Sequence, residues 1–194
     1  MSSNPVTKLT EQEYLALDRA AEIRSEFLDG EMFAMSGAAP RHIFLHANLL
    51  AEMHAALRGR ECRVGGPDFR VRVSATGMYA YPDLVVICGK LLLMDAHQDI
   101  LLNPAIIFEI LSPSTEEDDR GLKFRHYRTI ESLQEYVLVD QNQVQIEQYT
   151  RQPDNTWTFR DYQGLDAELK LDSIGVTLPV QRIYDRIDVQ SEPA

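Results

Sequence analysis

The sequence predicts an α/β fold in which a mixed β-sheet is flanked by helices, with a β-hairpin added at the N-terminal and the C-terminal end. Segments with apolar residues at helical spacing alternate with short continuous apolar runs, which are typical of strands buried on both faces. Near each end of the chain, two strand-like segments flank a cluster of turn residues. Residues 1–194 are predicted to form a single domain with its core at about 40–140, because no linker or internal repeat divides them.

The amino-terminal part is predicted to contain a short helix, a hairpin and a longer helix. Thr10 and Glu13 have the spacing of a capping box, and the apolar residues behind them predict an amphipathic helix. Strand-like residues flank Asp29-Gly30, a dipeptide that tolerates the positive φ angles of a tight hairpin turn. Pro40 suits the first turn of a helix, and apolar residues recur behind it at helical spacing as far as Leu57. The second helix is therefore predicted from about Pro40 to Leu57.

The central part is predicted to supply the main sheet. Residues 69–73 alternate between apolar and basic types, as in a strand with one buried and one solvated face. Residues 84–87 and 105–108 are continuous apolar runs, and we expect them to be central strands. A turn, a further helix, a buried strand and a more exposed hairpin are predicted next, at 112–115, 122–130, 136–139 and 144–162.

The composition favours a protein that folds around its own core, since 44% of the residues are hydrophobic and 25% are charged. No apolar run approaches the roughly 20 residues of a membrane helix, and the amino terminus lacks the pattern of a signal peptide. We therefore expect no membrane association. Cys62 and Cys88 are the only cysteines, and we expect them to be packed thiols of a protein in the reducing cytoplasm.

The formal net charge of −11 argues against a protein that coats nucleic acid by bulk electrostatics. A local basic stretch runs from Arg58 to Arg72 and contains five arginines and only two acidic residues. We expect this stretch, Arg70 and Arg72 in particular, to supply part of any nucleic-acid contact. The same alternating residues could instead only solvate one face of a strand.

Two carboxylates are placed where burial would be costly without a partner. Asp83 stands at the start of one apolar strand and Glu109 near the end of the next. If these strands are antiparallel neighbours, both carboxylates reach the same edge of the sheet. Together with the backbone carbonyl of Ile110 they would form an all-oxygen site suited to Mg²⁺ or Mn²⁺. Alternatively, each acid could pair with an arginine or cap a turn.

Several motifs resemble the Uma family of restriction-endonuclease-like proteins, a family of the PD-(D/E)XK nuclease superfamily. The resemblance runs from about Tyr14 to Asp188. The motifs that carry it are Leu28-Asp29-Gly30-Glu31, Met35-Ser36-Gly37, Pro40-Arg41-His42, Tyr81-Pro82-Asp83, residues 108–115 (FEILSPST), Asp119-Arg120-Gly121 with Lys123-Phe124, and residues 135–140 (EYVLVD).

The resemblance implies a restriction-endonuclease-like core of helix, three strands, helix and strand, in which Asp83 and Glu109 bind the metal. The superfamily places a lysine two residues after the second acid, but Leu111 occupies that position here. We expect Lys123, on the following helix, to replace it. The alternative for Lys123 is an exposed salt bridge to Asp119, four residues earlier, a common and weak interaction.

The resemblance also brings the hairpin and the start of the following helix toward the same site. Glu26 is a candidate third acid and His42 a further candidate catalytic residue, although hairpin carboxylates are more often solvated or paired. His42, His46 and His54 share one helical stripe, which would also fit a zinc site. Histidines satisfied by hydrogen bonds on the helix surface are the simpler interpretation.

The function that follows is a Mg²⁺- or Mn²⁺-dependent endonuclease that hydrolyses phosphodiester bonds in DNA. Because the chain is acidic, we expect a homodimer that gathers its arginines into one groove, or dependence on a partner. The alternative is a nucleic-acid-binding or interaction module of the same fold with little or no catalysis, which the displaced lysine favours. A small-molecule hydrolase that uses the carboxylate pair is a third possibility.

Overall fold

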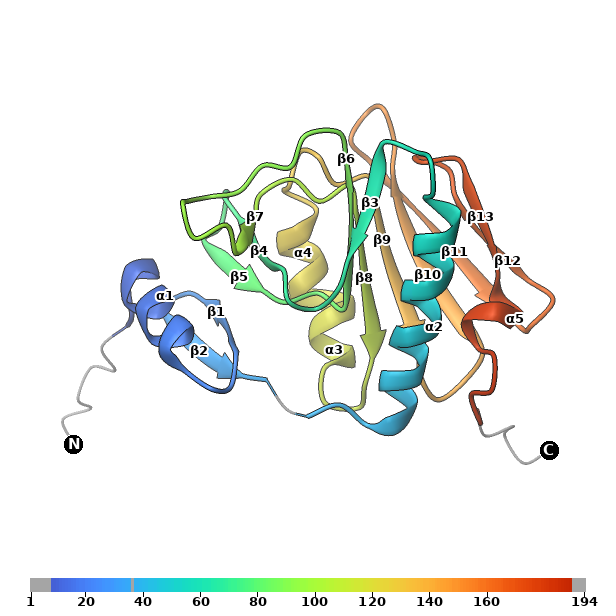
Figure 1. Ribbon diagram of the computed structural model, residues 1–194, viewed down its shortest axis with the longest axis horizontal. Coiled ribbons are helices and arrows are strands. Elements are labelled where there is room, and N and C mark those ends of the chain that lie inside the picture. Colours follow the sequence, from blue (N-terminus) through green and yellow to red (C-terminus); the bar gives the residue numbers. More distant parts are fainter. Residues whose placement is uncertain (1–7, 36, 190–194) are drawn as a thin grey trace.

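The computed structural model describes residues 8–35 and 37–189 (Figure 1). Ser36, in the motif Met35-Ser36-Gly37, lies outside them. The main sheet has six strands, in the order β11 (Trp157–Gln163), β10 (Gln145–Arg151), β9 (Glu135–Asp140), β8 (Ile106–Leu111), β6 (Leu84–Cys88) and β3 (Cys62–Gly65). Strands β8 and β9 are parallel, and the other neighbours are antiparallel. The predicted mixed sheet is confirmed, but residues 70–73, which the sequence pattern assigns to it, belong to a second sheet, and residues 62–65 supply its edge strand instead.

One face of this sheet is covered by α2 (Pro40–Ala56), α5 (Val180–Ile183) and the hairpin of β12 (Glu168–Leu171) and β13 (Val176–Pro179) (Figure 1). Helix α2 begins at Pro40, as predicted. Its Leu45, Leu49 and Met53 are fully buried and pack with Leu84 and Phe108 of the sheet. This core holds the strand that begins after Asp83 in a fixed position relative to α2.

The other face carries a continuous helical segment made of α3 (Glu116–Asp118), a π-helical turn η1 (Asp119–Lys123) and α4 (Phe124–Tyr127). The same face of the main sheet also packs against part of a second sheet. The strands of this second sheet follow the order β2 (Glu31–Ala34), β1 (Ser25–Leu28), β5 (Met78–Ala80), β4 (Arg70–Val73) and β7 (Ile100–Leu101). In β6, Leu84 and Val86 belong to the first core, while Val85 and Ile87 belong to the second. The apolar run is therefore a central strand with both faces buried, as expected.

The amino-terminal lobe contains α1 (Glu11–Ala20) and the β1–β2 hairpin, and it forms the blue end of the ribbon in Figure 1. The predicted capping box is present, because the Thr10 side chain accepts from the Glu13 N–H and the Glu13 carboxylate accepts from the Thr10 N–H. Asp29 and Gly30 take φ values of 51° and 85° in the hairpin turn. The hairpin is part of the second sheet, because β1 pairs with β5.

The expectation that Arg70 and Arg72 face nucleic acid is wrong. The Arg70 guanidinium is buried, donating to Asp18 Oδ2 at 2.5 Å and to the Tyr81 hydroxyl at 2.7 Å. Arg72 donates to Glu11 Oε2 at 3.0 Å. Both side chains fasten helix α1 onto β4, a long-range contact that the alternation of residue types along β4 could not reveal.

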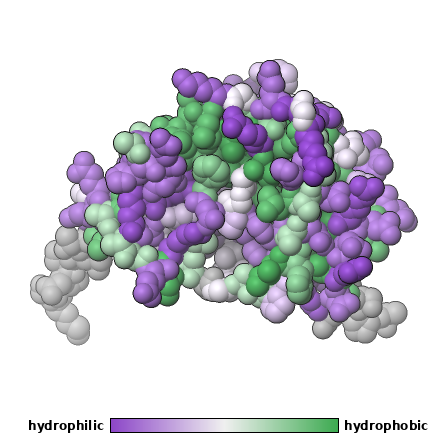
Figure 2. Space-filling model, viewed as in Figure 1, coloured by the Kyte–Doolittle hydropathy of each residue, from purple (hydrophilic) through white to green (hydrophobic). Residues whose placement is uncertain are grey.

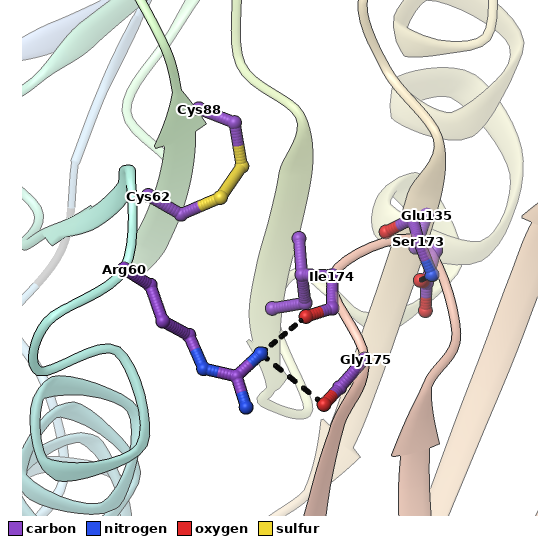
Figure 3. Close-up of a disulfide and its surroundings, with 7 residues drawn as sticks. All are labelled: Arg60, Cys62, Cys88, Glu135, Ser173, Ile174 and Gly175. Carbon is purple, nitrogen blue, oxygen red and sulfur yellow. Dashed lines mark hydrogen bonds between the residues drawn. A yellow bond between two sulfur atoms is a disulfide. The ribbon is translucent and has the colours of Figure 1, made fainter.

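The expectation that Cys62 and Cys88 are packed thiols is also wrong, because the two residues form a disulfide (Figure 3). Strands β3 and β6 pair so that Cys62 lies directly opposite Cys88, with their Cα atoms 4.0 Å apart. Arg60, just before β3, donates to the Ile174 carbonyl at 2.7 Å and so joins this edge to the β12–β13 turn. The expectation of a cytoplasmic location relied on free thiols, and the disulfide removes this argument for it.

Reducing the disulfide is expected to destabilise the protein by about 3.5 kcal/mol, because the crosslink closes a loop with a sequence separation of 26 residues. Urea unfolding with and without dithiothreitol measures this difference. The double variant Cys62→Ala/Cys88→Ala is the control, since its midpoint should not respond to the reductant. Two titratable thiols in the unreduced, denatured wild type would show that the bond does not form.

The outer surface on the side of α2 is mostly hydrophilic, with small hydrophobic patches between the polar side chains (Figure 2). Ile43 and Phe44 of α2 are more than half exposed. Among the described residues, no helix is both long and apolar enough to cross a membrane.

Candidate active site

Asp83 and Glu109 meet at the edge of the main sheet where β6 begins and β8 ends. Strands β6 and β8 are antiparallel neighbours, and the register that pairs Leu84 with Phe108 brings the two acids opposite each other one step further. The Asp83 N–H donates to Glu109 Oε2 at 3.4 Å, and Asp83 Oδ2 accepts from the Ile110 N–H at 2.7 Å. The antiparallel arrangement and the convergence of the two carboxylates agree with the sequence-based expectation.

The Glu109 carboxyl is buried, with 3% of the residue exposed. The Tyr127 hydroxyl of α4 donates to Glu109 Oε1 at 3.1 Å. Burial raises the pKa of Glu109 well above its usual range, and the nearby Lys123 ammonium offsets this only in part. Three neighbouring carboxylates raise this pKa further, those of Asp119, Asp83 and Glu26. Four carboxyl groups thus share the single ammonium of Lys123, and the neutral form of Glu109 is favoured.

Lys123 extends from the π-helical turn into the centre of this acidic group. Its Nζ lies 3.0 Å from Glu26 Oε1, 3.1 Å from Asp119 Oδ1 and 3.5 Å from Glu109 Oε1. Burial alone would lower the pKa of Lys123, but the three carboxylates raise it well above its usual range. The ion pair with Asp119 exists, but it is buried and so differs from the exposed salt bridge considered as the alternative.

Asp119 is a site residue that sequence reasoning considered only as a partner for Lys123. It is 2% exposed, and its backbone carbonyl accepts from the buried Tyr136 hydroxyl at 2.9 Å. Burial raises its pKa, against the lowering effect of Lys123. Residues 116–119 are all acidic, so composition could not show which of them faces inward. π-Helical turns are rare and are frequently found at functional sites, and this one carries both Asp119 and Lys123.

Glu26 and His42 also reach the site from separate elements. Glu26 of β1 contacts Lys123 as described and accepts from the Tyr81 N–H at 3.3 Å. His42, in the first turn of α2, places Nε2 3.3 Å from Asp83 Oδ1. Burial lowers the pKa of His42, but the hydrogen bond to Asp83 and its charge outweigh burial and raise it overall. All five candidate catalytic residues are thus gathered around one sheet edge.

The three histidines on α2 do not share one environment. His46 Nε2 lies 3.1 Å from the Asp83 carbonyl oxygen, whereas His54 is exposed. Among the described residues, no group of three or more His, Cys, Asp or Glu side chains is arranged to hold a metal ion. The zinc alternative therefore has no support in the described structure.

The donor set fits a hard divalent cation more closely. Mg²⁺ commonly uses one or two carboxylates and keeps several waters, so it needs no cage of three side chains. Asp83 and Glu109 supply two converging carboxylates, and Ile110 brings its backbone to the same place. The buried oxygen Asp119 Oδ1 has no hydrogen-bond donor in good geometry, although Lys123 is near. Excess buried negative charge is the environment that a divalent cation stabilises.

The chain is similar to known proteins over most of its length. The model of the Uma2 family, described as "Putative restriction endonuclease", matches residues 11–181. Uncharacterized protein slr1290 of Synechocystis sp. is 34% identical over 183 residues, which is 94% of each chain. Uncharacterized protein sll1609 of the same organism is 35% identical over 162 residues, or 84% of this chain and 92% of that one.

One solved structure is similar in fold. It is the crystal structure of a "putative nuclease" from Anabaena variabilis, with a TM-score of 0.75 and 17% sequence identity. The alignment covers 91% of this chain and 97% of the other. This similarity supports the restriction-endonuclease-like α/β fold and says nothing by itself about individual residues.

Proposed function

The chain belongs to the Uma2 family, and on this premise we propose that it is a metal-dependent endonuclease that hydrolyses phosphodiester bonds in DNA. One observation supports this above the others. Asp83 and Glu109 converge at the sheet edge, and the Lys123 ammonium lies 3.5 Å from Glu109. Two carboxylates and a lysine at such an edge are the groups that phosphodiester hydrolysis by this fold requires.

Asp83, Glu109 and the backbone carbonyl of Ile110 would hold Mg²⁺ or Mn²⁺. The cation would polarise the scissile phosphate and lower the pKa of a bound water. The arrangement around the two acids keeps their oxygens in place, because Tyr127 donates to Glu109 and the Ile110 N–H donates to Asp83. His42 contacts Asp83 from the first turn of α2 and orients the same carboxylate.

Lys123 would orient the attacking water or stabilise the negative charge that develops on the phosphate. Glu26 and Asp119 hold its ammonium from two sides, so its position is fixed before the substrate binds. In-line attack would release a 5′-phosphate and a 3′-hydroxyl, with no covalent intermediate on the protein.

DNA binding needs more positive charge than one chain offers at this site. The net charge is −11, and Arg70 and Arg72 are engaged inside the protein. We propose that a homodimer, or a partner, completes the DNA-binding groove. Other arginines of the basic stretch, Arg58 and Arg63, are exposed and remain candidates for the contact.

The second candidate is a nucleic-acid-binding module of this fold without significant catalysis. One observation favours it: three carboxylates surround the three N–H donors of Lys123, which leaves none free for a phosphate. Catalysis would require Glu109 to release Lys123 when the cation binds. Cation binding therefore separates the two candidates.

The test of the proposed function is a cleavage assay on supercoiled, linear and single-stranded DNA with Mg²⁺ or Mn²⁺, with wild type beside Asp83→Ala. We expect wild type to nick or linearise the supercoiled form and the variant to leave it intact. Equal cleavage by wild type and a folded Asp83→Ala protein would contradict the assignment of Asp83 to the active site. No cleavage of any of the substrates, in a protein that binds DNA, would favour the module.

Mg²⁺ or Mn²⁺ is expected to stabilise the folded protein, because the cation compensates the buried charge of Glu109 and Asp83. At a hundredfold excess over Kd, the stabilisation is about 2.7 kcal/mol. Thermal unfolding and calorimetry measure it, with NaCl at equal ionic strength as the control. An unchanged unfolding temperature and no binding heat, in wild type, would contradict a divalent-cation site.

A further inference from the structure

A row of aromatic rings runs across the main sheet from the core to its edge. We call Phe124, Tyr149, Trp157 and Phe159 the aromatic strip. Phe124 of α4 stacks on the buried Tyr136, with ring centroids 5.4 Å apart and planes 8° apart. The remaining neighbours continue outward, since the Phe124–Tyr149, Phe124–Trp157 and Tyr149–Phe159 centroids are 4.3, 5.4 and 5.2 Å apart.

The strip becomes exposed as it approaches the edge strand β11. Tyr136 is fully buried, the three rings next to it are half-buried, and Phe159 is 56% exposed. The pairs across β10 and β11 include Tyr149 with Phe159 and Arg151 with Trp157. Burial of apolar surface explains the inner rings. It does not explain a large aromatic ring that stands mostly in solvent at the end of the row.

Positive charge surrounds the helical end of the strip. The Arg151 guanidinium lies over the Trp157 ring, 4.7 Å from its centroid. Arg125 and Arg128 of α4 and its C-terminal cap are exposed, and neither forms an ion pair with the described residues. Glu147, the acidic residue of β10, is paired with Arg120. In a chain with a net charge of −11, these three arginines give the helical end of the strip a local positive charge, whereas Asp161, two residues after Phe159 on the same side of β11, places a carboxylate beside the outer end.

We propose that the aromatic strip binds single-stranded DNA, with unpaired bases stacked on Phe159 and its neighbours and with Arg125 and Arg128 against the phosphates. Aromatic rings beside cationic side chains are the usual platform for single strands, because every base offers a flat face. A duplex keeps its bases stacked on one another and cannot use such a platform. The strip begins on the same helical segment as the candidate active site, since Phe124 directly follows Lys123 in the chain. The inference relies on the proposed function only for the class of ligand.

The experiment uses Trp157, the only tryptophan in the chain, as the reporter. A 20-nucleotide oligo(dT) is titrated into the full-length protein in EDTA, which prevents cleavage, and the tryptophan fluorescence is followed. The same titration is made with a duplex of equal length and with polyphosphate, which carries charge without bases. We expect saturable quenching by oligo(dT) and clearly weaker effects from the other two. Equal quenching by the duplex or by polyphosphate would overturn the proposal.

Variants identify the rings and charges involved. Phe159→Ala should weaken oligo(dT) binding about fivefold or more, the loss of one stacked base. Phe44→Ala is the matched control, because Phe44 is also an exposed aromatic residue but lies on α2, which covers the opposite face of the main sheet. Phe159→Leu keeps an apolar side chain without the ring and should behave like Phe159→Ala. Equal affinity of Phe159→Ala and Phe44→Ala would overturn the proposal.

The phosphate contacts are tested by the salt dependence of binding. Arg125→Gln with Arg128→Gln should reduce the slope of log Kd against log salt by about 0.7 for each phosphate that the variant no longer binds. Arg182→Gln with Arg186→Gln is the control pair, because both side chains are exposed at or just after α5, on the opposite face of the main sheet, and its slope should match wild type. Quenching by oligo(dT) without DNA cleavage would keep this inference and refute the proposed function. Cleavage without any effect of Phe159→Ala would do the reverse.

Discussion

Asp83→Asn and Glu109→Gln are each expected to abolish metal-dependent DNA cleavage while the protein stays folded. Each substitution removes a carboxylate that would hold the cation, and an amide binds Mg²⁺ poorly. Both keep the shape of the side chain, and in Glu109→Gln the amide oxygen can still accept from the Tyr127 hydroxyl. Cleavage of supercoiled DNA, measured with circular dichroism on the same samples, tests both variants.

The expected effect on stability is opposite in sign to the effect on cleavage. Because Glu109 is buried and lies near other carboxylates, neutralising it should leave the metal-free protein as stable as wild type or more stable. Glu135→Gln is the matched control, since Glu135 is also buried but pairs with Ile106 at the opposite end of β8. Cleavage at the wild-type rate by a folded Asp83→Asn protein would rule out the metal assignment. Unfolding of both site variants would make the acids structural.

Lys123→Met is expected to cut turnover by roughly 10²- to 10³-fold, the usual effect of losing one donor to the transition state. It should also lower the free energy of unfolding by about 3–5 kcal/mol, because Glu26, Glu109 and Asp119 would lose the ammonium between them. Single-turnover cleavage and urea unfolding measure the two effects separately. Wild-type turnover by Lys123→Met would remove the lysine from the mechanism.

Adding Asp119→Asn to Lys123→Met separates the expected effect of Lys123 on turnover from its effect on stability. The second substitution removes one of the unpaired carboxylates, so the double variant should be more stable than Lys123→Met alone. Turnover should not recover, since the donor is still missing. Asp119→Asn by itself should lower turnover less than Lys123→Met, because Glu26 still holds the ammonium at 3.0 Å. Equal stability of the single and double variants would mean that Asp119 and Lys123 are not coupled.

The convergence of Asp83 and Glu109 could be predicted because the β6–β8 ladder follows from two short apolar runs. An acid at the start of one antiparallel strand and another at the end of its neighbour must meet. The proposed role of Lys123 comes from the family resemblance, since nothing in the periodicity predicts that a helix residue reaches the end of a strand. Leu111, which occupies the usual lysine position, is buried in an apolar cluster with Tyr127 and Leu138.

Three features could not be predicted from local sequence patterns. Arg70 is buried only because Asp18, on a distant helix, neutralises it. Cys62 and Cys88 bond only because the β3–β6 register sets them opposite each other. Asp119 faces inward because of a π-helical turn, and a regular helical period could not place it. Local patterns predicted the elements, whereas packing between elements decided these side chains.

Glu26 makes the amino-terminal hairpin indispensable to any shortened form of the protein. The core predicted at about residues 40–140 contains Asp83, Glu109, Asp119 and Lys123, yet it would begin after β1 and lose the carboxylate 3.0 Å from the lysine. Such a fragment would also lose the pairing of β1 with β5 and the ion pair between Arg70 and Asp18. A truncation library screened for solubility would therefore select against pieces that begin after β1. Proteolytic trimming between Ala34 and Pro40 would remove Glu26 from the candidate site without cutting the main sheet.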